Sequence, residues 1–230
     1  MKTQRVLLKL SGETLSGGKN VIDNASLQNI AEELKEPLSH KIKFGIVVGA
    51  GNIWRGAGKE IERVSADKMG MLATTINAIA ITEILKSNNI KTVMLSAENV
   101  TGFYETVSVQ KANEYLDDGY VVVFGGGLGK PYFTTDTTSA VRASEINADV
   151  ILKATQVDGV YTADPKKDPA AKKYDKLSYK EAIDKKLKIM DLSAFEICMK
   201  NKIAVYVFDF YKKGNLQKIL NGQNIGTIVS

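Results

Sequence analysis

The sequence has very few of the residues on which several common chemistries depend. Its 230 residues include one cysteine, Cys198, and one histidine, His40. A disulfide framework, a Cys/His zinc site and a Ser–His or Cys–His catalytic pair are therefore excluded. We expect Cys198 to lie in the core and His40 to lie on the surface at a helix end.

Long hydrophobic runs are also lacking. Lys9 interrupts the apolar run near the N-terminus, so the hydrophobic region of a signal peptide is missing. No stretch approaches the roughly 20 apolar residues of a membrane-spanning helix. The sequence contains four prolines, and no Pro/Ser-rich linker divides it. We therefore expect a single domain spanning residues 1–230, located in the cytoplasm, with no membrane partner.

The net charge of +5 is concentrated in one segment. Residues 166–202 hold eleven lysines against six acidic residues, and the rest of the chain is balanced. These lysines are not interleaved with aromatic residues that would stack on bases, which disfavours nucleic acid as a partner. A solvated face, or a field that attracts a polyanionic small molecule, fits the pattern better.

Short apolar runs typical of buried strands recur along the chain, and segments with helical apolar spacing separate most of them. The strand-like runs are Arg5–Leu10, Phe44–Val48, Thr92–Leu95, Tyr120–Phe124, Val150–Lys153 and Ala204–Phe208. This alternation predicts an α/β fold, a three-layer αβα sandwich around a mainly parallel central sheet. Such sheets bind ligands beyond the carboxyl ends of their strands. The apolar helix expected over residues 69–85 would serve as core or as a subunit interface.

Residues 121–138 combine a buried strand, a glycine-rich loop and a helix start. Gly125, Gly126, Gly127 and Gly129 lie within five residues. The side chains of 134–136 (Thr-Thr-Asp) suit a helix N-terminus, where backbone N–H groups and the helix dipole favour an anion. Neither the Walker A pattern nor the Rossmann glycine pattern fits any strand end. The sequence therefore predicts a phosphate site distributed over several strand ends.

Phosphoryl transfer suits a chain with so little nucleophilic chemistry, because it depends on positioning and positive charge. Lys9 follows a buried strand and could reach a moving phosphoryl group, and Arg55 could grip a phosphate. Asp136, Asp164 and Asp191 could orient lysines or hold Mg²⁺. The alternatives stay open at this point: a lysine at a sheet edge, a surface arginine, and carboxylates that cap helices or turns.

Several sequence blocks, in this order, resemble the bacterial UMP kinases of the amino acid kinase superfamily. The blocks are 8–13, 49–58, 67–73, 129–136, 148–155, 157–165 and 190–195. The first block is common to the superfamily, whereas the block at Asp67 together with Pro131–Asp136 is specific to UMP kinases. The resemblance runs nearly end to end.

The resemblance implies transfer of the γ-phosphoryl group of ATP to UMP, giving UDP, with Mg²⁺ as cofactor, in pyrimidine nucleotide biosynthesis. It implies catalytic roles for Lys9, Asp136 and Asp191, and Lys153 is a further candidate. The implied ATP-binding residues are Lys9, Leu10, Ser11, Gly12, Gly51, Arg55, Thr155, Gln156, Tyr161 and Asp164. The implied UMP-binding residues are Ala50, Arg55, Asp67, Leu128, Gly129, Lys130, Pro131, Tyr132, Phe133, Thr134 and Thr135. No residue is assigned as a dedicated metal ligand.

The resemblance also implies a division of labour and an assembly. The N-terminal part would mainly bind UMP, and the part from about residue 150 would mainly bind ATP. The family forms homohexamers, assembled as trimers of dimers, and UTP is the expected feedback inhibitor. Ala50 stands where many relatives have glycine, which is tolerable if its φ is not positive. The loop Leu15–Ile22 is shorter than in relatives that respond to GTP, which argues against GTP activation.

Two other readings remain as alternatives. Another superfamily kinase, acting on a carboxylate or a carbamate, would share residues 9–12 but would not need the UMP-type blocks. A non-catalytic nucleotide-binding sensor would be favoured by loss of Lys9 or Asp191, and both are present.

Overall fold

The computed structural model describes residues 4–18, 20–55, 60–99, 103–165, 167–187 and 189–230. Its strands are β1 (Arg5–Leu10), β2 (Lys43–Val48), β3 (Thr92–Ser96), β4 (Glu105–Thr106), β5 (Val121–Gly125), β6 (Val150–Thr155), β7 (Val160–Tyr161), β8 (Lys173–Tyr174), β9 (Lys176–Leu177), β10 (Ala204–Asp209) and β11 (Thr227–Val229). Within these residues, β7 and β8 form a small antiparallel ribbon and the other strands form one nine-stranded sheet.

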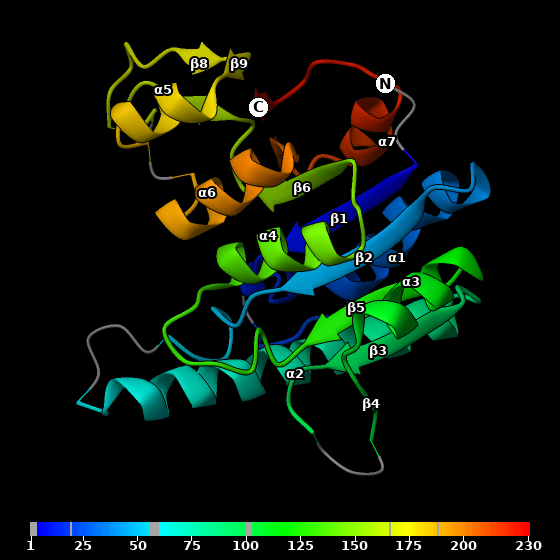
Figure 1. Cartoon of the computed structure of the whole chain (residues 1–230). Helices are drawn as coiled ribbons and strands as arrows, with labels where there is room; N and C mark the ends of the chain where they lie inside the picture. Colours follow the sequence, from blue (N-terminus) through cyan, green and yellow to red (C-terminus); the bar gives the residue numbers. More distant parts are fainter. Residues whose placement is uncertain (1–3, 19, 56–59, 100–102, 166, 188) are drawn as a thin grey trace.

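The sheet runs through the middle of the molecule in the order β4-β3-β5-β2-β1-β6-β10-β11-β9 (Figure 1). Among the described strands, every neighbouring pair in it is parallel except β10 and β11. The prediction of a mainly parallel sheet is confirmed. The carboxyl ends of the parallel strands consequently lie along one edge, where the glycine-rich segments follow them.

Helices cover both faces of the sheet. They are α1 (Asn24–Ser39), α2 (Arg63–Ser87), α3 (Val109–Asp117), α4 (Thr135–Glu145), α5 (Tyr179–Asp184), α6 (Leu192–Asn201) and α7 (Asn215–Leu220), with a 3₁₀ turn at η1 (Gly12–Leu15). Along β1, Val6 and Leu8 pack in the cluster with α1, α2 and α7, while Leu7 packs in the cluster with α3 to α6. This alternation between two apolar layers gives the predicted αβα sandwich.

Several local predictions are confirmed. The first predicted strand matches β1, and β6 runs two residues beyond its predicted end. Thr134 caps α4, and its hydroxyl oxygen accepts hydrogen bonds from the N–H groups of Asp136 and Thr137. Cys198 is buried, and His40 is exposed at the end of α1.

Helix α2 presents apolar side chains on two sides. Its Ala73, Ala78 and Ile81 are at most 3% exposed. On another face, Met69, Leu72, Ile76 and Ile79 are 38–52% exposed and form what we call the α2 stripe. The single helix predicted over residues 69–85 as core or interface therefore supplies core on one side and an uncovered apolar surface on the other. Within the described residues, no helix has the length and apolarity needed to cross a membrane.

Candidate active site

Two lysines and one aspartate form a buried cluster at the carboxyl ends of β1 and β6. Lys9 and Lys153 are paired in register on these neighbouring parallel strands. Asp136, in the first turn of α4, lies 3.1 Å from the Lys9 ammonium and 2.9 Å from the Lys153 ammonium. The three side chains are 11%, 12% and 20% exposed for Lys9, Lys153 and Asp136 respectively. The two like charges are therefore held side by side by one carboxylate.

The cluster has a distinctive electrostatic balance. Burial by itself would raise the pKa of Asp136, but the charges of Lys9 and Lys153 outweigh it and hold that pKa below its usual range. Burial lowers the pKa of Lys153, attraction to Asp136 opposes this, and repulsion by Lys9 adds to it. Lys153 also donates a hydrogen bond to the Ile189 carbonyl. With both lysines charged, the cluster carries one surplus positive charge, which suits an anionic group at the adjoining α4 N-terminus.

Asp191 joins the starts of two helices. It caps α6, accepting a hydrogen bond of 2.9 Å from the Ala194 N–H. Its carboxylate also accepts hydrogen bonds from the hydroxyls of Thr134 and Thr137 at the start of α4. The structure thus gives Asp191 the capping role that the sequence left open as an alternative. Its catalytic role stays a prediction.

The glycine loops after β1 and β2 pack backbone to backbone. A Cβ on Gly12 would lie within 3.0 Å of the Asn52 side-chain oxygen and of the Gly51 nitrogen. A Cβ on Gly51 would meet the Glu13 carboxylate just as closely. Any side chain at Gly12 would push the two loops apart, so glycine is needed there. Ala50, which lies between Gly49 and Gly51, is not among the residues with positive φ, so the condition for tolerating alanine is met.

Arg55 lies on the outer side of this loop. Its guanidinium pairs with Glu13 and donates a 3.1 Å hydrogen bond to the Gly51 carbonyl, and its side chain is 70% exposed. A phosphate would have to displace or share the Glu13 contact. The predicted phosphate-binding role of Arg55 stays a prediction, and the residues directly after it in its sequence block, 56–58, lie outside the described residues.

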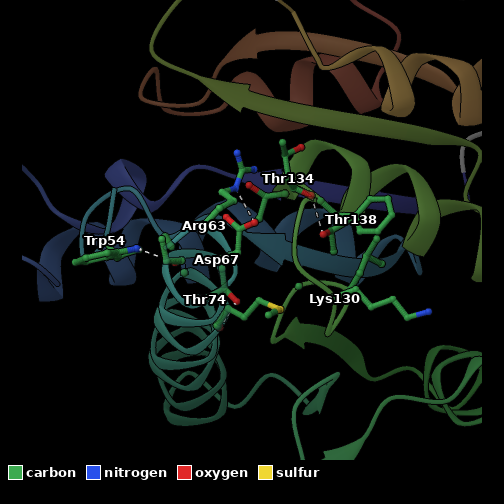
Figure 2. Close-up of a pocket in the computed structure, with 15 residues that line it drawn as sticks. Trp54, Arg63, Asp67, Thr74, Lys130, Thr134 and Thr138 are labelled. Carbon is green, nitrogen blue, oxygen red and sulfur yellow. Dashed lines mark hydrogen bonds and ion pairs between the residues drawn. The ribbon is translucent and has the colours of Figure 1, made fainter. Parts of the chain in front are cut away.

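A cavity of about 290 Å³, which we call the α2–α4 cavity, opens beside the start of α4 (Figure 2). It is lined by Ala50, Trp54, Arg63, Ala66, Asp67, Gly70, Met71, Thr74, Gly127, Leu128, Lys130, Phe133, Thr134, Thr135 and Thr138. Asp67 accepts hydrogen bonds from Arg63 (2.8 Å) and from the Tyr132 N–H (2.7 Å). Burial would raise the pKa of Asp67, but these two bonds outweigh it and leave the pKa below the usual value. In Figure 2 the Lys130 side chain extends away from Asp67 and Arg63.

The α2–α4 cavity collects most of the residues predicted to bind UMP. Those in its walls are Ala50, Asp67, Leu128, Lys130, Phe133, Thr134 and Thr135. Gly129, Pro131, Tyr132 and Arg55 are described residues that lie outside its walls.

Several lining residues of this cavity were missed by the sequence reasoning. Arg63 and Asp67 lie four residues apart on one helix, and this spacing predicts an ion pair between them. Trp54, whose indole N–H donates to the Ala66 carbonyl, belongs to the block 49–58, but its residue type alone does not indicate a role in the cavity. Thr74 and Thr138 carried no sequence signal that separates them from ordinary helix residues.

A second cavity of about 470 Å³, the β6–β7 cavity, is lined in part by Lys153 of the lysine cluster. It is lined by Lys153, Thr155, Val157, Gly159, Val160, Tyr161, Thr162, Ala163, Asp164, Lys185, Lys186, Leu187, Ile189 and Val207. Three of the predicted ATP-binding residues, Thr155, Tyr161 and Asp164, are therefore together. Gln156 lies instead in a neighbouring hollow of about 490 Å³ with Glu13 and Tyr211.

The cluster connects the two cavities. Lys153 lines the β6–β7 cavity and pairs with Asp136, which directly follows Thr135 in the wall of the α2–α4 cavity. Leu10, a predicted ATP contact, has a fully buried side chain, which leaves only its backbone for a ligand. The arrangement suits the passage of an anionic group from one cavity to the other.

Comparison with known proteins agrees with this geometry. The model of the amino acid kinase family matches residues 4–209. The uridylate kinase of Porphyromonas gingivalis is 47% identical over 231 residues, covering 99% of this chain and 97% of that protein. The uridylate kinase of Parabacteroides distasonis is 46% identical over 230 residues, with 98% of each chain covered.

Solved structures lead to the same family. The UMP kinase from Bacillus anthracis superposes with a TM-score of 0.97 at 36% identity, covering 100% of this chain and 97% of that one. The UMP kinase from Ureaplasma parvum superposes with a TM-score of 0.94 at 36% identity, with both chains fully covered. The chain therefore belongs to the amino acid kinase family and, within it, to the uridylate (UMP) kinases.

Proposed function

We propose that this uridylate kinase, which phosphorylates UMP to UDP, takes the γ-phosphoryl group from ATP in the β6–β7 cavity and transfers it to UMP in the α2–α4 cavity. One observation carries the proposal: Lys153 lines the β6–β7 cavity, and its partner Asp136, which also pairs with Lys9, directly follows Thr135 in the wall of the α2–α4 cavity. Phosphoryl transfer needs such a centre of positive charge between donor and acceptor.

The cluster supplies electrostatic stabilisation at the point of transfer. The Lys9 ammonium stabilises charge on the moving phosphoryl group, and Asp136 keeps Lys9 and Lys153 together despite their repulsion. Asp191 orders the start of α4 through its contacts with Thr134 and Thr137. Because these groups are fixed before the substrate arrives, little reorganisation accompanies the reaction.

The α2–α4 cavity offers groups suited to each part of UMP. The Asp67 carboxylate would accept a hydrogen bond from a ribose hydroxyl. Thr134 and Thr135 would bind the phosphate at the start of α4, where the helix dipole favours an anion. Ala50 and the loop from Leu128 to Phe133 would enclose the nucleotide, and Arg55 would complete the phosphate site by leaving Glu13.

The donor site combines the β1 and β6 strand ends. Residues 9–12 and Gly51 would contact the ATP phosphates, since the Gly12 and Gly51 backbones lie against each other there. Thr155, Tyr161 and Asp164 would form the adenine side, with Gln156 at its border. The N-terminal part would thus mainly bind UMP and the part from about residue 150 mainly ATP, within one domain; the lining residues, 50–138 for one cavity and 153–207 for the other, support this division.

Mg²⁺ fits this site as an ion carried by the nucleotide. Both lysines occupy the Asp136 carboxylate, and two hydroxyls and a backbone N–H occupy that of Asp191. In the described residues, no group of three or more His, Cys, Asp or Glu side chains could hold a metal. Mg²⁺ commonly binds through substrate phosphates, water and one or two carboxylates, and it would supply neutralisation of phosphate charge here.

The oligomer is proposed from the α2 stripe. An apolar surface of this kind, with Met69, Leu72, Ile76 and Ile79 exposed on one helix, is typical of a subunit interface. We propose that the chain forms the homohexamer, a trimer of dimers, that its resemblance to the family implies, and that the α2 stripe lies at one of the contacts. Ile76→Asp should lower the mass measured by light scattering, and an unchanged mass would remove the stripe from the interface. UTP inhibition, the absence of GTP activation and the cytoplasmic location stay predictions.

The reaction is tested with a coupled ADP-release assay using Mg-ATP and a panel of UMP, CMP, dTMP, AMP, carbamate and N-acetylglutamate. Turnover confined to UMP supports the assignment of the two cavities. Turnover with only a carboxylate or a carbamate would keep the Lys9 cluster and overturn the acceptor assignment. Nucleotide binding without any turnover would favour a non-catalytic sensor.

A further inference from the structure

A reciprocal pair of amide side chains lies behind the glycine loops. Asn77, in the middle of α2, is fully buried. Its amide N–H groups donate to the Asn52 side-chain oxygen at 2.7 Å and to the Gly49 carbonyl at 2.8 Å. The Asn52 amide in turn donates to the Asn77 side-chain oxygen at 3.0 Å and to the Val21 carbonyl at 2.7 Å. The two backbone carbonyls fix the orientation of both amides, because a flipped amide would present an oxygen to a carbonyl.

This amide pair touches both halves of the proposed transfer site. Gly49, whose carbonyl accepts from Asn77, directly precedes Ala50 in the wall of the α2–α4 cavity. The Asn52 side-chain oxygen lies against Gly12, so closely that a Cβ on Gly12 would lie within 3.0 Å of it. The pair therefore sets the position of the β2 loop relative both to α2 and to the β1 loop.

Other buried polar side chains of α2 form their hydrogen bonds within the helix itself. Three threonines in α2, Thr74, Thr75 and Thr82, are also buried, and their hydroxyls donate back to carbonyls of the same helix. The hydrogen bonds that these hydroxyls donate stay within α2. Asn77 instead directs both of its N–H groups outside its own helix, to Asn52 and Gly49. That difference points to a role in holding the loop.

We propose that Asn77 and Asn52 are positioning residues that fix the β2 loop between the donor and acceptor sites. The proposal rests on the proposed function, because it assigns the loop to both nucleotides. Phosphoryl transfer requires an aligned donor and acceptor, and a shift of about 1 Å in such a site can cost on the order of 100-fold in rate. Ground-state binding is spread over many lining residues, so loss of the pair acts mainly on kcat.

The test compares Asn77→Ala, Asn52→Ala and the double variant with Thr82→Ala. Thr82 is a matched control because it is buried in the same helix and its hydroxyl donates to the Ala78 carbonyl of that helix. We expect each asparagine variant to lower kcat with UMP and Mg-ATP by about 10- to 100-fold, with both KM values changed less than about threefold. The double variant should be no more than about threefold worse than either single one, because the two amides act as a unit. Thr82→Ala should keep kcat within about twofold of wild type.

The proposal is overturned by wild-type kcat in a folded Asn77→Ala or Asn52→Ala variant, by additive losses in the double variant, or by an equal loss in Thr82→Ala. If Asn77→Ala does not fold, the kcat of Asn52→Ala tests the proposal. The Asn52 side chain is only partly buried and lies outside α2, so we expect this variant to fold. Wild-type turnover of a different acceptor would overturn the proposed function alone. The amide pair would then be judged by the same kcat ratios with that acceptor.

Discussion

The buried carboxylate of Asp136 gives the sharpest stability prediction. Asp136→Asn keeps the shape of the side chain but removes the charge that neutralises Lys9 and Lys153, whose ammonium groups lie 3.1 and 2.9 Å away. Removing one partner of a buried ion pair typically costs roughly 3–5 kcal/mol. We therefore expect the free energy of unfolding to fall by about 3–5 kcal/mol.

The same variant should show a specific pH dependence. Burial already lowers the pKa of Lys153, and Asp136 is the group that opposes this shift. Without Asp136 the folded-state pKa falls further below the unfolded value of about 10.4. A cation whose folded-state pKa is lowered destabilises the protein at low pH. This penalty begins to shrink as pH rises through the folded-state pKa, and it is gone once pH exceeds the unfolded pKa. The stability deficit of the variant should therefore shrink between neutral pH and about pH 10.

Urea denaturation followed by circular dichroism, at equal protein concentrations, measures this deficit. Asp117→Asn is a matched control, because Asp117 also pairs with two cations, Arg5 and Lys43, each at 2.7 Å, but its side chain is 58% exposed. The control should unfold close to wild type, since exposed pairs contribute little. The reasoning is refuted if Asp136→Asn matches Asp117→Asn, or if its deficit does not shrink at alkaline pH.

Three further predictions concern activity. Lys9→Ala should keep the fold and the affinity for UMP, measured by calorimetry. Its kcat should fall by several orders of magnitude, because the variant lacks a positive charge at the transfer point. Near-normal turnover would remove Lys9 from that role. Asp67→Asn should raise the KM for UMP by about tenfold and leave the KM for ATP nearly unchanged. Asp67 lines the α2–α4 cavity and does not line the β6–β7 cavity. An equal increase in both KM values would contradict the acceptor assignment. Gly12→Ala should lower kcat/KM at least about tenfold, because the new Cβ would displace Asn52 and Gly51; parental kinetics would show that the loops can separate without cost.

The mainly parallel character of the sheet could be predicted from the sequence, because six of its strands are short apolar runs and helical segments separate most of them. The order of the strands was not predicted. The cap at Thr134 was equally visible, since a hydroxyl before a helical run has a local cause. The pairing of Lys9 with Lys153 was not visible, because register between distant strands depends on tertiary packing. The β6 end was missed for the same reason. Of the α2 residues that line the α2–α4 cavity, Asp67 was predicted, whereas Thr74 carried no local signal.

The residues of α2 show most clearly where sequence reasoning stops. A helix that is apolar on most sides gives no period that separates Ile76, which is exposed, from Ile81, which is buried. Asn77 looks like a polar interruption of this apolar helix. The proposed role of Asn77 depends on its hydrogen bonds to Gly49 and Asn52, which the fold brings to it from another segment.

The central place of β1 has a consequence for how the molecule assembles. The strand is the first in the chain, yet it lies between β2 and β6. During synthesis β2 follows soon after β1, whereas β6 emerges only after α4. Until β6 has been made, the N–H and C=O groups along one edge of β1 stay unpaired. We expect the part of the chain before β6 to take shape first and the part from β6 onward to dock onto that open edge, with this long-range parallel pairing as the slow step. Lys9 would then meet Lys153 late in folding, when Asp136 is already in place to receive both.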